Sequence, residues 1–163
     1  QMWRNPEEIP GNGVDDDGDG YVDNVSGIST FNRWSAPDDE SGHGTHAAGT
    51  IGAAANDGHP HVGVAWKVRL MACKFLDPDG FGFTSDAVRC IDFAVLKGAK
   101  IINASWVSGP YSQSLFDAIA RSKNRQGDCE KFDFVALESV GKYFDYPVAL
   151  YRVQNGHAVR VGG

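Results

Sequence analysis

Residues 41–50 read SGHGTHAAGT and form the most informative segment of the chain. Within it, His43 stands between two glycines, just before an apolar run at 47–55 that is typical of a buried helix. The glycines leave the imidazole ring uncrowded and allow another backbone to approach it closely. A general base needs an imidazole that reaches a cleft and titrates near the working pH. The stretch therefore makes His43 a candidate general base.

A lone histidine between glycines would be weak support, because many histidines only begin a helix. The ten residues together are more specific, since they closely resemble the histidine signature of the subtilisin-like serine proteases (subtilases, peptidase family S8). In that family the first histidine of the His-Gly-Thr-His run is catalytic, which corresponds to His43. The resemblance implies a serine endopeptidase that uses a Ser-His-Asp triad on extended peptide or protein substrates. It also implies a secreted, extracellular protein.

The resemblance covers the chain from its first residues to about residue 120. It includes the acidic loop at 3–23 and two segments that look like family core, at 62–66 and 101–106. Beyond that point the sequence shows no such likeness. We therefore expect a partial catalytic domain at 1–120 and a divergent tail of unknown origin at 121–163.

Only one of the three triad residues is found in the sequence. In the family the catalytic aspartate ends an apolar strand that would precede Gln1. The nucleophilic serine lies in a segment of the Gly-Thr-Ser-Met-Ala type, which does not occur in this sequence. A histidine without its nucleophile cannot perform acyl transfer. We therefore expect a fragment that is inactive alone and, because its sheet lacks neighbouring strands, only marginally stable.

Two other interpretations stay open. In the first, the chain is a non-catalytic relative that keeps the subtilase scaffold and its calcium loop as a binding or interaction module. In the second, it is an unrelated α/β domain whose match to the signature is a coincidence. A triad aspartate and serine encoded beside this chain would favour the enzyme, and their absence would favour the module.

The order of the predicted elements is that of an α/β fold. Strands are predicted at 25–31, 64–75 and 100–105, and helices at 43–55, 85–96 and 112–121. Alternation of this kind favours a parallel sheet with helices on both faces. The resemblance makes that sheet subtilisin-like and incomplete in this chain. In the tail, Asn155 and Gly156 separate two alternating segments, which predicts a β-hairpin with a type I′ turn.

Acidic residues are concentrated at one end of the chain. The net charge is −6, but residues 1–40 hold ten acidic against two basic residues, so they carry −8 and the rest carries +2. This distribution argues against a nucleic-acid partner and for a local cation site. No apolar run in the sequence is long enough to cross a membrane. The sequence gives no indication of an oligomeric state.

Four alternating aspartates form the candidate cation site: Asp15, Asp17, Asp19 and Asp23. Alternate carboxylates in a tight loop suit Ca²⁺, which takes about six to eight oxygen ligands. The spacing fits an EF-hand loop that begins at Asp15, except that Ser26 stands where the closing glutamate would be. The alternative is a solvated acidic turn. Repulsion among the carboxylates and the family's common use of structural calcium favour the metal.

Two segments are candidates for binding substrate through the backbone. By resemblance to the family they are Gly80, Phe81 and Gly82, and Ser105, Trp106 and Val107. Exposed backbone edges bind extended peptides by strand addition. The family usually has glycine where Val107 stands, so this side chain is expected to crowd the entrance to the S1 pocket. The alternative is that Phe81 and Trp106 are only core or surface aromatics.

The chain has three cysteines, an odd number that cannot all pair with one another. Cys73 lies in a strand-like run and Cys90 in a helix-like one, and we expect both to be buried free thiols. Cys129 lies in the divergent tail and has no evident role.

Overall fold

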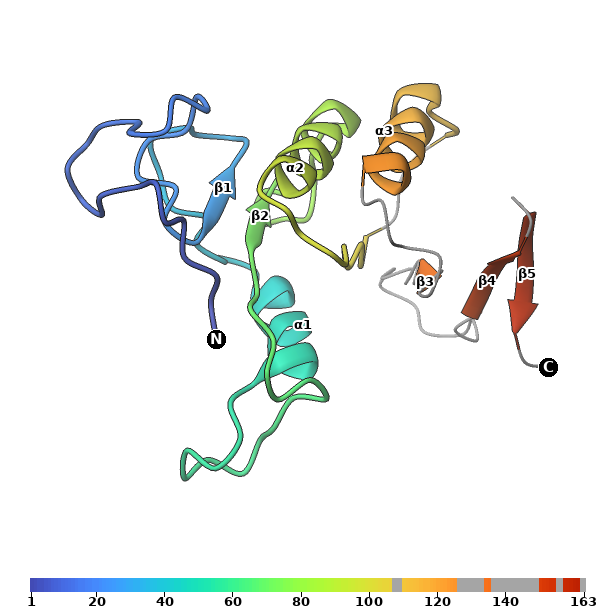
Figure 1. Cartoon of the computed structure of the whole chain (residues 1–163), viewed down its shortest axis with the longest axis horizontal. Helices are drawn as coiled ribbons and strands as arrows, with labels where there is room; N and C mark the ends of the chain where they lie inside the picture. Colours follow the sequence, from blue (N-terminus) through green and yellow to red (C-terminus); the bar gives the residue numbers. More distant parts are fainter. Residues whose placement is uncertain (107–109, 126–133, 136–149, 155–156, 162–163) are drawn as a thin grey trace. The chain divides into compact units, whose positions relative to one another are not determined.

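The structure is a computed structural model that describes residues 1–106, 110–125, 134–135, 150–154 and 157–161 (Figure 1). The chain divides into two compact units, residues 1–90 and residues 91–163. In chain order the elements are β1 (Gly27–Ser29), α1 (His43–Gly52), β2 (Ala72–Lys74), α2 (Thr84–Leu96), α3 (Gln113–Arg125), β3 (Phe134–Val135), β4 (Leu150–Gln154) and β5 (His157–Val161).

The first unit is built on a small parallel sheet. β1 pairs in parallel with β2, and Gly27 lies opposite Ala72. Residue 27 has to be glycine because its φ is 139° and a Cβ atom there would lie 1.8 Å from the Ala72 carbonyl oxygen. Just before β2, Met2 forms a parallel bridge with Leu70. Because α1 connects β1 to β2, the sequence prediction of a parallel α/β arrangement is confirmed for this unit.

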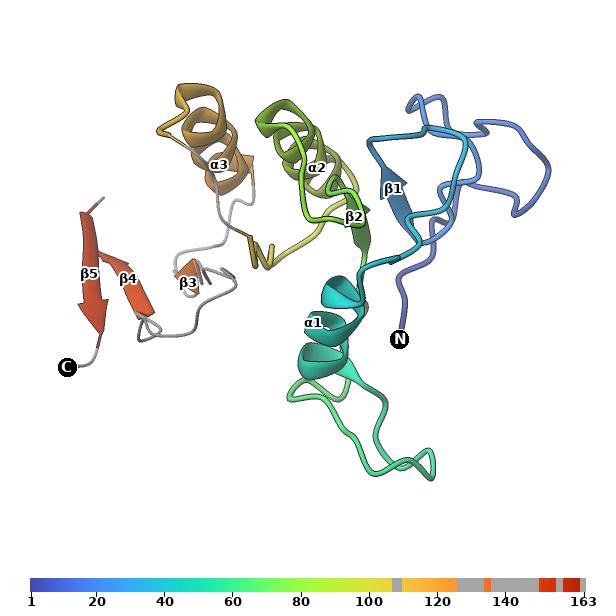
Figure 2. The same cartoon turned by 180° about the vertical axis from the view of Figure 1, so that it is seen from behind.

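α1 ends at Gly52, three residues earlier than predicted. Gly52 is buried, and a Cβ atom there would lie 2.5 Å from Cγ1 of Val68, so close packing requires glycine. The chain leaves the helix as a long loop and returns alongside it, as both views show (Figure 1, Figure 2). On its return, the amides of residues 63–65 donate to carbonyls of Thr50, Ile51 and Ala53, at the end of α1 and directly after it. The predicted strand at 64–75 is therefore wrong for its first part, and only 72–74 form a strand.

The prediction of two free thiols is also wrong. Cys73 of β2 and Cys90 of α2 form a disulfide, with their Cα atoms 5.8 Å apart. This separation lies within the range that a disulfide requires. The sequence alone did not reveal that the buried face of α2 brings Cys90 back onto β2. Cys129 lies outside the described residues.

The two helices predicted after β2 are confirmed apart from their ends. α2 ends at Leu96, as predicted, and is followed by Gly98, which has φ 78° and donates to the Val95 carbonyl, while the next amide donates to Ala94. α3 begins after Ser112, whose hydroxyl accepts from the Leu115 amide, and it runs four residues beyond the predicted end. The predicted strand at 100–105 is absent: Ala104 forms a single β-bridge, and none of these residues belongs to a strand that the structure describes.

The tail contains the predicted hairpin strands. β4 and β5 pair in antiparallel fashion, and β3 joins the other edge of β4. The connecting residues 155 and 156 lie outside the described part of the chain, so the turn type stays a prediction.

Candidate functional site

His43 is the first residue of α1 and its side chain is exposed. Gly42 precedes it in the left-handed conformation, with φ 84°, and supplies no side chain to cap the helix. Among the described residues, the His43 side chain has no hydrogen-bond or ion-pair partner. The imidazole is therefore presented at the start of a helix and is open to a partner, as a general base has to be.

The start of α1 is held by the carboxylate of Asp39. One of its oxygens accepts from the amides of Ser41 and Gly42 at 3.1 and 2.9 Å. The other oxygen accepts from the amide of Thr45 at 2.7 Å. These donors lie on both sides of His43 along the chain. Asp39 therefore does the work of the missing helix cap from outside the helix.

These contacts change the acidity of Asp39. The hydroxyl of Thr45 is the largest cause, and the backbone donors add to it, so that the pKa of Asp39 is lowered from 3.8 to about 2. Hydrogen bonds to the ionised form favour that form. The carboxylate is therefore charged at any pH near neutrality.

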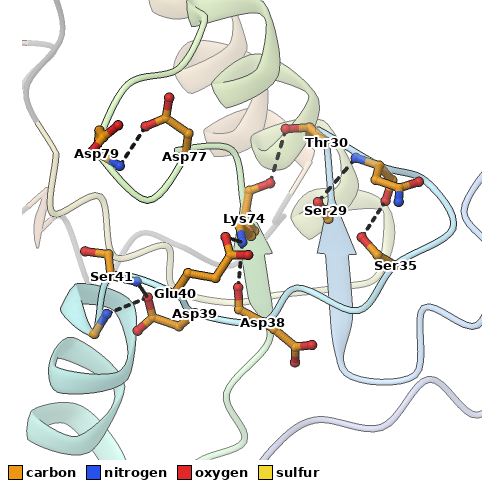
Figure 3. A network of polar contacts seen from close by, with 12 residues as sticks. Ser29, Thr30, Ser35, Asp38, Asp39, Glu40, Ser41, Lys74, Asp77 and Asp79 are labelled. Carbon is orange, nitrogen blue, oxygen red and sulfur yellow. Dashed lines mark hydrogen bonds and ion pairs between the residues drawn. The ribbon is translucent and has the colours of Figure 1, made fainter.

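Lys74 of β2 fastens the loop that carries Asp39. Its ammonium group donates to the carbonyl of Asp38 at 2.8 Å and forms an ion pair with Glu40. Figure 3 shows Lys74 reaching both residues, with Asp39 between them in the chain. The Lys74 side chain is 19% exposed and that of Glu40 is 58% exposed, so the ion pair is open to solvent on the side of Glu40.

The acidic loop does not gather its four predicted ligands at one point. Asp23 accepts from the amides of three successive residues, 11–13, and so closes the loop upon itself. Asp19 accepts from the side-chain amide of Asn24. Asp15 and Asp17, in contrast, lie beside a third carboxylate that the sequence pattern did not select.

That third carboxylate belongs to Glu8. Oxygens of Glu8, Asp15 and Asp17 lie within 4.8 Å of one another. Glu8 is buried, with 6% of its surface exposed, and one of its oxygens accepts from the amides of Asp16 and Asp17. Its other oxygen is buried without a hydrogen-bond partner. Burial raises the pKa of Glu8, with the charges of Asp17 and Asp16 as smaller causes.

The three carboxylates have the chemistry of a site for a hard cation. Carboxylate oxygens are the ligands that Ca²⁺ prefers, and a buried carboxylate oxygen without a partner is costly unless something compensates for its charge. The residues present therefore fit a calcium ion. Spacing within the Asp-Gly run could not reveal Glu8, because it precedes that run and joins it only through the fold.

The two predicted substrate segments belong to different units. Phe81 lies in a tight turn, in which its amide donates to the Asp77 side chain at 2.8 Å, and its ring is 73% exposed. Gly82 packs so closely that a Cβ atom would lie 2.1 Å from the Phe75 carbonyl oxygen. In the other segment, the hydroxyl of Ser105 accepts from Asn103 at 2.8 Å.

The remaining members of these segments add little. Gly80 completes the turn through a hydrogen bond from its amide to the carbonyl of Asp77. Trp106 is half-buried and has an interaction partner. Val107 lies outside the described residues, so its effect on an S1 entrance stays a prediction. Among the residues described, no helix has the length and apolar character needed to span a membrane.

Comparison with known proteins gives a consistent result. The model of the subtilase family, peptidase S8, matches residues 7–146. This match extends past residue 120, where the visible likeness to family motifs ends. Subtilisin-like protease 1 of Plasmodium vivax is 40% identical over 115 residues, which are 70% of this chain and 18% of that protein.

Two Plasmodium falciparum proteins are also similar. Subtilisin-like protease 1 is 35% identical over 76% of this chain and 18% of its own length, and subtilisin-like protease 2 is 41% identical over 53% of this chain and 6% of its own. The chain therefore spans less than a fifth of the relatives that it matches. Its family-model match covers most of the chain, and together with the histidine signature at the exposed start of α1 it shows that the chain belongs to the subtilase family.

Proposed function

We propose that this chain is the histidine-bearing part of a subtilisin-like serine endopeptidase in which His43 is the general base. The observation that carries the proposal is the exposed position of His43 at the start of α1, within the family's signature. From there the imidazole takes the proton of a serine nucleophile and later gives it to the leaving amine. The proposal places the serine and the aspartate of the triad on segments outside this chain.

The same proposal makes this chain inactive when it is alone. It holds no serine segment of the family type, and a general base has no substrate bond to break without a nucleophile. Peptide hydrolysis by the isolated chain above the level of a His43→Ala variant would contradict this.

The test uses the protein expressed from the complete gene. We expect a fluorophosphonate probe, which reacts with activated serines, to label it, and peptide hydrolysis to depend on His43. The matched control is His59→Ala, since His59 is also exposed but lies in the loop after α1. Loss of activity in His43→Ala alone supports the enzyme. Failure of the probe to label the protein, together with no hydrolysis, would favour the non-catalytic scaffold instead.

We propose extended peptides or proteins as substrates and a secreted location. The turn at 80–82 and the segment at 105–107 are the proposed backbone edges for substrate. The Cys73–Cys90 disulfide supports the location, because disulfides persist in oxidising compartments. Detection of the protein with both thiols reduced inside the cytosol would contradict it.

We also propose one structural Ca²⁺, held by Glu8, Asp15 and Asp17. Two observations support this: one buried oxygen of Glu8 has no hydrogen-bond partner, and carboxylate oxygens of Glu8, Asp15 and Asp17 lie within 4.8 Å of one another. This set replaces the run of four aspartates as the preferred ligands, because Glu8, Asp15 and Asp17 are the carboxylates grouped within 4.8 Å among the described residues. Affinity is expected to be modest, about 10⁻⁵ to 10⁻³ M, as for extracellular modules.

Titration calorimetry with calcium alone tests the ion site. We expect a binding heat in the unchanged protein, no heat in Asp15→Asn with Asp17→Asn, and the same heat in Asp38→Asn. Asp38 is the matched control because its substitution also removes one acidic charge, while its side chain lies outside the acidic loop. If calcium gave no binding heat in the unchanged protein, the ion site would be wrong and the loop would be only an acidic turn closed by its own hydrogen bonds.

A further inference from the structure

We propose that Asp39 is a positioning residue for catalysis: its carboxylate fixes the backbone on both sides of His43 and so sets the direction of the imidazole. The inference rests on the proposed function, in which His43 is the general base. It goes beyond it because Asp39 belongs to no triad and contacts no reacting atom.

The hydrogen bonds of Asp39 bracket the histidine. The amides of Ser41 and Gly42 precede His43 and donate to one oxygen, and the amide of Thr45 follows it and donates to the other. A single carboxylate thus holds two residues before His43 and one residue after it. Without these hydrogen bonds, the glycines at 42 and 44 would give this segment of backbone more conformational freedom than other residue types would.

The space around the carboxylate agrees with this arrangement. A Cβ atom at Gly44 would lie 3.6 Å from the second Asp39 oxygen, at ordinary van der Waals distance. Because Gly42 has no side chain to cap the helix, the Thr45 amide in the first turn is satisfied by this outside acceptor. The low pKa of Asp39 agrees with this, because the same hydrogen bonds stabilise its ionised form.

Asp39 transmits a position only because its own loop is anchored. Lys74 of β2 holds the residues directly before and after it, through the carbonyl of Asp38 and the carboxylate of Glu40 (Figure 3). β2 in turn is paired with β1 and linked by the disulfide to α2. Lys74 therefore links the sheet to residues 38 and 40, and Asp39 between them holds amides on both sides of His43.

This anchoring matters because catalysis is sensitive to small displacements. A shift of about 1 Å in a reacting group costs on the order of 100-fold in rate. The loss falls on the chemical step, since substrate binds at backbone edges that Asp39 does not touch. A purely structural residue would instead lower the amount of folded protein, and kcat per folded molecule would not change.

The experiment compares Asp39→Asn and Asp39→Ala with the control Asp38→Asn in the protein expressed from the complete gene. Asp38 is adjacent and carries the same charge, and among the described residues its side chain makes no hydrogen bond or ion pair. Active sites are counted by burst titration, so that kcat refers to folded enzyme. Hydrogen exchange is followed by mass spectrometry in peptides that contain residues 41–46.

We expect both Asp39 variants to exchange faster at 41–46 and to lose about 10- to 100-fold in kcat with KM within about twofold, while Asp38→Asn matches the unchanged protein. Unchanged exchange in Asp39→Ala would overturn the inference, because the contact would not hold the helix start. Faster exchange with unchanged kcat would overturn it as well, because the held segment would not direct His43. A protein whose hydrolysis survives His43→Ala would instead overturn the proposed function, and the exchange result would still decide whether Asp39 holds the helix.

Discussion

Glu8 and Asp39 are two carboxylates in the same unit of the chain, and the structure treats them in opposite ways. Glu8 is buried, one of its oxygens has no hydrogen-bond partner, and its pKa is raised. Asp39 is exposed, both of its oxygens accept hydrogen bonds, and its pKa is lowered to about 2. From burial alone, one would expect Glu8 to hold the structure together and Asp39 to be only a surface charge.

The difference shows that what faces a carboxylate decides its role. Glu8 is buried and lies beside two other carboxylates, so its ionised form is costly until a cation neutralises the group. Asp39 faces backbone amides at the positive end of a helix, so its ionised form is already compensated by the protein. The first arrangement is suited to binding an ion, and the second is suited to holding a backbone in place.

The largest effect is expected from His43→Ala, which should change activity at the start of α1 without changing calcium binding in the acidic loop. In the protein from the complete gene, this variant should lose several orders of magnitude in turnover, because triad members act as a unit. The rise in melting temperature with calcium should be unchanged, since the acidic loop does not use His43. Peptide hydrolysis and calorimetric melts measure the two effects on the same samples. If the calcium response disappeared together with activity, the two regions could not be treated as independent.

The next largest effect is expected from opening the disulfide. Cys73 and Cys90 are 17 residues apart, and closing a loop of this size stabilises by about 3 kcal/mol in the chain-entropy description. Cys73→Ser with Cys90→Ser should lower the free energy of unfolding by about that amount. The loss should speed hydrogen exchange around β2 and Lys74 more than in the acidic loop. Equal acceleration in both regions would show that the unit unfolds as one.

The effect of Glu8→Gln on the free energy of unfolding should have opposite signs without and with calcium. Without the ion, the variant should be more stable, because a neutral side chain avoids the cost of a buried charge. With calcium at about a hundredfold excess over Kd, binding should stabilise the unchanged protein by about 2.7 kcal/mol, and the variant should lack this stabilisation.

Melting curves with chelator and with millimolar calcium measure both signs. Asp23→Asn is the contrast, since it removes the acceptor of three backbone amides and should destabilise with or without calcium. If Glu8→Gln destabilised equally in both solutions, Glu8 would be only a buried acceptor.

The comparison also shows what the sequence was able to predict. The helix at His43, the helices at 85–96 and 112–121, and the hairpin strands followed from local patterns and were confirmed, apart from their ends. Local patterns failed where a segment's partner decided its structure. Residues 64 and 65 were predicted as strand, but their amides donate to carbonyls at the end of α1.

The same limit applies to the sites. The catalytic candidate was found because its signature is continuous in sequence. Glu8 and the Cys73–Cys90 pair were missed because the fold brings them to partners that spacing does not specify. Asp39 was passed over because a surface aspartate has no pattern that distinguishes it from its neighbour Asp38.

The smallest expected effect concerns pH and separates these two neighbours. The pKa of Asp39 is about 2 in the folded chain against an ordinary value of 3.8. A carboxyl group whose folded pKa is depressed contributes stability that is fully present above the unfolded value and is lost as pH falls towards the folded one. Between about pH 4 and pH 2, the unchanged protein should therefore lose protection at residues 41–46, whereas Asp39→Asn should already lack it at neutral pH. Because Asp39 is exposed, the effect on global stability should be slight and best seen locally, by hydrogen exchange corrected for the intrinsic rate at each pH. Asp38→Asn should follow the unchanged protein through the same range, and equal pH profiles in all three proteins would show that Asp39 does not hold the start of α1.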